Sequence, residues 1–302
     1  MKLTVIQKPK DGVLSGPKAL KFSMHYGDVN YDLSIEQCVQ RTITIASQSQ
    51  VTYPDILKVY YSLETLLMIL DGQFYPVVSA FEDSIEITHS LQRRTLPSYN
   101  SADFMIGHGN VLAGFETVVN SERLLKWISL REELDIIHNM VLYCLSSVQM
   151  PKDMQCAFMT EAFEGLSELV SKRKPEIVFS QAKKGESQLK INLLTFITNY
   201  GALIFQEETK NDARILAQIL VDSRNRIAHI KSKQGRVYLD GAESVMYLKK
   251  LSLMYRIVLI ELLGIDESVY LTRLSSHVKS INEHDTMKKF LHKLGEANGR
   301  SA

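Results

Sequence analysis

Residues 211–229 read NDARILAQILVDSRNRIAH, and this stretch indicates how the second half of the chain folds. Its aliphatic side chains recur at intervals of three and four residues, which is the spacing of one face of an α-helix. They are Ile215, Leu216, Ile219, Leu220 and Ile227. A helix with a single apolar stripe must pack that stripe against other elements. We therefore expect this helix to belong to a bundle.

Further helical patterns lie on both sides of the quoted stretch. In the candidate helix at residues 154–174, Phe158 is expected on the buried side. A shorter amphipathic tail follows from Asp266. The four other long candidates are residues 121–147, 154–174, 187–205 and 241–264. Because these patterns follow one another with little between them, residues 119–302 are predicted to form an all-α antiparallel bundle with short connections.

The first part of the chain has a different pattern. Residues 52–72 have helical spacing, with Thr52 as a candidate N-cap and Gly72 as a typical last residue. The segments with strand character, which alternate or are rich in β-branched residues, are 3–7, 18–27, 40–47, 75–81 and 84–90. The predicted fold class is therefore α+β: a β-rich or mixed domain over residues 1–118, with a sensing or recruiting role, followed by the helical domain.

Composition and charge exclude several classes of protein. The chain has 45% hydrophobic residues, so a packed core is expected. Its net charge of +1 predicts no overall attraction to nucleic acid or membrane. Cys38, Cys144 and Cys156 are widely spaced, which favours reduced thiols over a disulfide framework or a zinc site. The N-terminus lacks the apolar core of a signal peptide, and no apolar run is long enough to span a bilayer. We expect a cytoplasmic protein without a membrane partner.

Charge is distributed unevenly along the chain. Residues 1–150 carry 12 basic and 16 acidic groups, whereas the remainder carries 23 and 18. The span from Arg224 to Arg236 alone holds five basic side chains and no acidic one. A basic cluster at the end of a helix complements the helix dipole, and it also attracts phosphate.

The quoted stretch ends with Arg224, Asn225, Arg226 and His229 close together. On a helix, Asn225 and His229 project from nearly one face, because they are four residues apart. Arg224 and His229 are five residues apart, so about 140° separates them at about 100° per residue. Two explanations remain open: the helix loosens before His229, or a second surface, such as another copy of the chain, completes a site.

These residue types suit the cleavage of RNA without a metal or another cofactor. Histidine can take and give a proton near neutral pH. An arginine can bind a phosphodiester through two N–H groups and stabilise the charge that grows on it. Asn225 would orient either partner. The simpler alternative is a helix end with cations that pair with the dipole and a structural histidine.

The segment 219–231, ILVDSRNRIAHIK, resembles the signature of the HEPN superfamily, an Arg often followed by Asn, with a His four to six residues after the Arg. Arg224, Asn225 and His229 occupy those places. Residues 157–170 are similar to the first helix of the HEPN bundle, with Glu161 and Glu164 as its acids. The phrase RNRIAH before a basic loop is most similar to the ApeA-like branch, whose members carry a β-rich N-terminal domain. The resemblance covers about residues 150–265.

The resemblance implies a metal-independent endoribonuclease that acts as a homodimer, with both motifs facing one cleft. It implies that His229 handles protons, that Arg224 holds the scissile phosphate and that Asn225 orients. Many HEPN proteins are toxins or effectors in prokaryotic defence against phage, so the implied partners are RNA, a second copy, and an antitoxin or a phage-derived trigger. By position alone, the RNA backbone would be contacted by Arg226, Lys231, Lys233 and Arg236. Other HEPN domains are non-catalytic and bind nucleotides or proteins, which is the alternative function.

Other histidines are weaker candidates for a site. The loop IGHGN at 106–110 has a single histidine without further ligands at metal spacing, which favours a turn at the domain boundary. His277 and His284 are seven residues apart beside Asp285, a spacing more typical of a solvated helix face. No metal site is therefore predicted.

Overall fold

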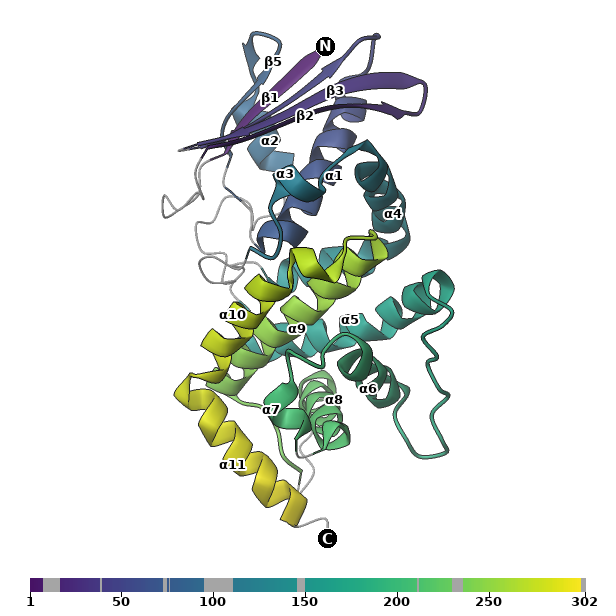
Figure 1. The fold of residues 1–302 in the computed structure, drawn as a ribbon, viewed down its shortest axis with the longest axis vertical. Helices are drawn as coiled ribbons and strands as arrows, with labels where there is room; N and C mark the ends of the chain where they lie inside the picture. Colours follow the sequence, from purple (N-terminus) through teal and green to yellow (C-terminus); the bar gives the residue numbers. More distant parts are fainter. Residues whose placement is uncertain are drawn as a thin grey trace. The chain divides into compact units, whose positions relative to one another are not determined.

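The computed structural model describes residues 1–7, 17–38, 40–72, 75, 77–94, 111–145, 150–210, 212–229 and 236–299. The chain divides into two compact units (Figure 1). The first comprises Met1–Glu132, Ser146–Val148 and Leu263–Ile265, and the second comprises Glu133–Leu145, Gln149–Leu262 and Asp266–Ala302. The boundary between domains expected at 118/119 stays a prediction.

A six-stranded antiparallel sheet forms one layer of the first unit, in the order β2-β3-β4-β1-β5-β6. Alternation of apolar and polar residues puts one face of each central strand in the core, as in β3, where Tyr31, Leu33 and Ile35 are buried. The strands are β1 (Lys2–Gln7), β2 (Lys18–Tyr26), β3 (Val29–Gln37), β4 (Arg41–Ser47), β5 (Val77–Glu82) and β6 (Ile85–Glu86).

Helix α1 (Tyr53–Asp71) is buried almost all round and forms much of the core of this unit. It begins after Thr52, whose N–H donates to the Asp55 carboxylate at 3.1 Å, and it ends at Gly72, whose φ of 74° is left-handed. The buried Trp127 donates its indole N–H to the carbonyl of Ser62 at 2.9 Å. The helix expected over residues 52–72 is therefore confirmed. A short helix, α3 (Phe115–Val118), is also part of this unit.

Two expectations for the region around the first unit were wrong. The strand expected over residues 84–90 is only the two-residue β6, and helix α2 (Thr88–Arg94) follows it directly. The hydroxyl of Thr88 accepts the Ala80 N–H at 2.9 Å, so the chain turns away from the sheet there. The long helix expected from residue 121 is α4 (Ser121–Cys144), but Asp135, with φ 27° and ψ −101°, interrupts it.

The second unit is helical, as predicted, and α5 lies at its centre against α6, α8 and α9. The C-terminal helix α11 packs against α7, α8 and α9. The elements are α5 (Lys152–Arg173), α6 (Gln188–Asn199), α7 (Gln206–Thr209), α8 (Ala213–His229), α9 (Gly241–Leu262), the 3-10 turn Glu267–Val269, α10 (Leu271–Asn282) and α11 (Asp285–Gly299). The α+β fold class, a sheet domain followed by a helical region, is confirmed.

Two details of the second unit differ from expectation. Phe158 was expected on the buried side of its helix but is 39% exposed. Not every connection is short, since residues 174–187 link α5 to α6 without regular structure. Within the described residues, no helix is both long and apolar enough to cross a membrane.

The three cysteines are free, and two of them are buried. Burial raises the pKa of the Cys144 and Cys156 thiols to about 12. Cys38 is exposed. The two buried thiols are therefore unreactive near neutral pH.

Candidate active site

Helix α8 continues without a break through its last described residue, His229. Its apolar stripe is anchored in the core by Leu216, Ile219 and Leu220, all buried as expected. From Asp222 onward the side chains become half-buried, and His229 is exposed. The helix therefore does not loosen before His229, which removes one of the two explanations left open by the sequence.

Arg224 is held in a fixed orientation by two neighbours. Its Nε donates to the Glu161 carboxylate of α5 at 2.6 Å, and its Nη1 donates to Oδ1 of Asn225 at 2.9 Å. The Arg224 and Glu161 side chains are 25% and 30% exposed, so the pair lies at the surface rather than inside the bundle. A guanidinium has five N–H donors, and these two bonds leave donors for a further acceptor such as phosphate.

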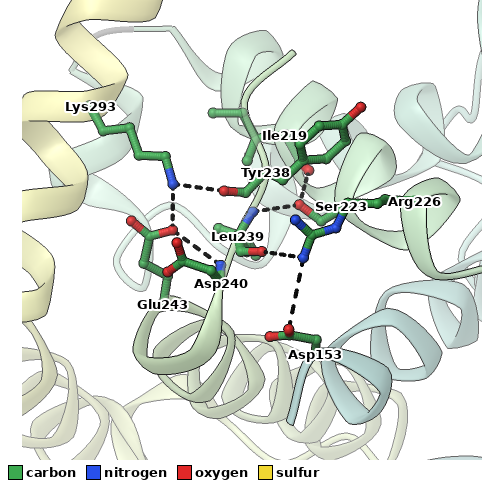
Figure 2. Close-up of polar contacts among 9 residues, drawn as sticks. All are labelled: Asp153, Ile219, Ser223, Arg226, Tyr238, Leu239, Asp240, Glu243 and Lys293. Carbon is green, nitrogen blue, oxygen red and sulfur yellow. Dashed lines mark hydrogen bonds and ion pairs between the residues drawn. The ribbon is translucent and has the colours of Figure 1, made fainter. Parts of the chain in front are cut away.

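Arg226 is also partly exposed, but it bonds to other parts of the helical unit. Its Nη2 donates to the carbonyl of Leu239 at 3.3 Å and is 3.8 Å from the Asp153 carboxylate of α5 (Figure 2). Its guanidinium carbon is 5.1 Å from the centre of the Tyr238 ring, within the range of a cation–π contact. Arg226 thus ties α8 to the segment that precedes α9. A contact between Arg226 and RNA stays a prediction.

The remaining basic residues proposed for RNA differ in what the structure shows of them. Arg236 donates to the Asp222 carboxylate at 2.7 Å, and its side chain is 41% exposed. Lys231 and Lys233 lie outside the described residues, as does the loop at 106–110. Their roles stay predictions.

A small recess lies between α5, α8 and the segment at Leu239. It has room for about one water molecule, which is far too little for a nucleotide. Its lining consists of Asp153, Cys156, Ala157, Thr160, Leu220, Ser223, Arg224, Arg226, Ile227, Leu239 and Ser244. This recess beside Arg224 is therefore not a binding pocket for a base.

No group of three or more histidine, cysteine or acidic side chains with the geometry of a metal site occurs in the part of the chain that the structure describes. His284 accepts or donates a hydrogen bond at 3.0 Å with Thr286 in the same turn.

Sequence reasoning identified the residues of α8 but not their partners. Glu161 was noted as an acid of its helix, yet its bond to Arg224 joins residues 63 positions apart. Asp153 and Leu239, which hold Arg226, were not identified at all. No periodicity in a single sequence reports such pairings, since each depends on how two helices pack.

The segment that carries this geometry also matches a known family. Residues 159–269 match the family model described as Apea-like HEPN, and they include Glu161, Arg224, Asn225 and His229. No curated protein and no solved structure matches the chain. An HEPN domain indicates a module of the ribonuclease or defence type. By this match, the helical region of the chain contains an Apea-like HEPN domain over residues 159–269.

Proposed function

We propose that the protein is a metal-independent endoribonuclease that acts as a homodimer and serves as a toxin or effector in prokaryotic defence against phage. The observation that carries the proposal is that one helix holds both an exposed His229 and an Arg224 whose guanidinium is already oriented by Glu161 and Asn225. Orientation before the substrate arrives is what makes a charged donor effective in a transition state.

In the proposed reaction, RNA supplies its own nucleophile. A general base removes the proton of a 2′-hydroxyl, and the 2′-oxygen attacks the adjacent phosphorus. The bond from phosphorus to the 5′-oxygen breaks, and a general acid protonates the leaving oxygen. His229 is the proton-transfer group, Arg224 stabilises the charge on the phosphoryl oxygens, and Asn225 orients Arg224. The products are a 2′,3′-cyclic phosphate and a 5′-hydroxyl.

The geometry of helix α8 supports a role for a second copy. Because α8 is intact, Arg224 and His229 point about 140° apart and do not converge on one phosphate within one chain. Two copies that face each other along the exposed ends of their α8 helices would bring an arginine of one to a histidine of the other. The exposed Phe158, one turn before Glu161 on α5, gives this surface an apolar group that a second copy could cover.

The test compares wild-type protein with Arg224→Ala and His229→Ala. The controls are Arg273→Ala and His89→Ala, which remove the same residue types from exposed positions. Loss of the proton-transfer group should lower the cleavage rate about 10³-fold, with unchanged circular dichroism. Cleavage by the wild type should persist in EDTA and leave 2′,3′-cyclic phosphate ends.

The same series separates the alternatives. A non-catalytic binding module would show no RNA cleavage and no difference in growth arrest between wild type and His229→Ala. A toxin silenced by a partner would be inactive when purified but would arrest growth in cells that lack that partner. Cleavage that survives in His229→Ala would contradict the proposed role of the histidine.

A further inference from the structure

The C-terminal helix α11 reaches the segment that follows the motif. Lys293 of α11 donates through Nζ to the carbonyl of Tyr238 and to the Glu243 carboxylate, both at 2.7 Å (Figure 2). The side chains of Lys293 and Glu243 are 31% and 11% exposed, so the contact is partly shielded from water. Glu243 also accepts the N–H of Asp240 at 3.3 Å. One ammonium group therefore fixes the backbone on both sides of Leu239.

The same backbone is bonded to the motif helix. The N–H of Leu239 donates to the hydroxyl of Ser223 at 2.8 Å, and its carbonyl accepts from Arg226. Ser223 directly precedes Arg224, and its hydroxyl donates to the carbonyl of Ile219 one turn earlier at 2.7 Å. Leu239 itself is 1% exposed, so this junction is held in the core. A continuous chain of contacts thus runs from Lys293 through the segment 238–240 to the last two turns of α8.

From this geometry we infer that Lys293 is a positioning residue for the site, acting through Tyr238 and Leu239 on the end of α8 that carries Arg224, Asn225 and His229. The inference rests on the proposed function. Helix ends fray readily, and a displacement of about 1 Å can cost about a hundredfold in rate. Lys293 lies beyond the matched residues 159–269, so this contact is a property of the chain outside its recognised family segment.

Arg226 and Lys293 both hold the segment 238–240, each from different helices. Arg226 holds it from α8 and α5, through Leu239 and Asp153, whereas Lys293 holds it from α11 and α9. If Lys293 is removed, the segment keeps its contacts to α8 but loses its attachment to the C-terminal helix. The motif helix should then remain folded while its last turn exchanges amide protons faster.

The experiment compares Lys293→Met and Lys293→Arg with Lys289→Met, a matched change at an exposed position on the same helix. Each full-length variant is assayed for RNA cleavage, thermal unfolding and amide hydrogen exchange. Lys293→Met should lower kcat at least about tenfold, with a smaller change in KM, and should speed exchange at Leu239 and at residues 227–229. Lys293→Arg should recover most of kcat, and Lys289→Met should match the wild type.

The inference would be overturned if Lys293→Met kept the wild-type kcat, or if its loss of activity simply followed a general loss of folded protein without faster exchange at these amides. A wild-type protein that cleaves no RNA would instead overturn the proposed function. The two failures are thus distinguishable in one series.

Discussion

Two ion pairs in the helical unit have nearly the same N···O distance, but one is buried and the other is partly exposed. Lys250 of α9 and Glu208 of α7 are joined at 2.7 Å with both side chains fully buried. Arg224 of α8 and Glu161 of α5 are joined at 2.6 Å at the surface. The buried pair is closed off by Tyr247, whose hydroxyl donates to Glu208 at 3.0 Å. Among the described residues, the surface pair shares a hydrogen bond with Asn225, and both of its side chains are partly exposed.

The difference lies in whether the cation can change its partner. Burial lowers the pKa of Lys250 although the charge of Glu208 opposes this shift, so that pair depends on remaining matched inside the protein. Arg224 is partly exposed, and its bonds to Glu161 and Asn225 leave donors that we propose bind phosphate. We therefore expect the first pair to stabilise the fold, and we propose that the second binds substrate.

The largest effect expected from this comparison is on stability. Lys250→Met should lower the free energy of unfolding by about 3–5 kcal/mol, because it leaves the Glu208 carboxylate buried without its cation. Chemical denaturation measures the change, with the neighbouring Lys249→Met as control. The folded fraction should keep its specific activity. A loss smaller than that of the control would contradict the structural role.

A smaller effect is expected at the surface pair. Glu161→Ala should lower kcat about tenfold because Arg224 loses its orienting partner, while stability should change by less than about 1 kcal/mol. Glu164→Ala, an exposed acid on the same helix, is the matched control for lost negative charge. Equal kinetics for the two variants would show that Glu161 orients nothing.

Periodicity predicted the elements whose ends carry local signals. Thr52 and Gly72 marked both ends of α1, and Pro175 follows the end of α5. The interruption of α4 at Asp135 carries no such signal, since neither glycine nor proline is present there. The end of β6 was missed because residues 87–90 continue a plausible strand pattern, whereas the bond from Ala80 to Thr88 is a tertiary contact.

The candidate site was predictable only along one helix. Arg224, Asn225 and His229 are readable as a motif because they are neighbours in sequence. Glu161 and Lys293 contribute from other helices, and their contacts depend on packing that a single sequence does not encode locally. The exposure of Phe158 was missed for the same reason, because helical spacing tells which side of α5 is apolar but not which part of it is covered.

The most direct test of the account asks whether one site uses residues of two chains. Arg224→Ala and His229→Ala proteins, each inactive alone, are mixed, allowed to exchange subunits and assayed for RNA cleavage. A mixed dimer would contain one site with an intact arginine from one copy and an intact histidine from the other. We expect roughly a quarter of wild-type activity, since half of randomly paired dimers are mixed and each has one complete site. A mixture that exchanges subunits but stays as inactive as its components would contradict a site shared between copies.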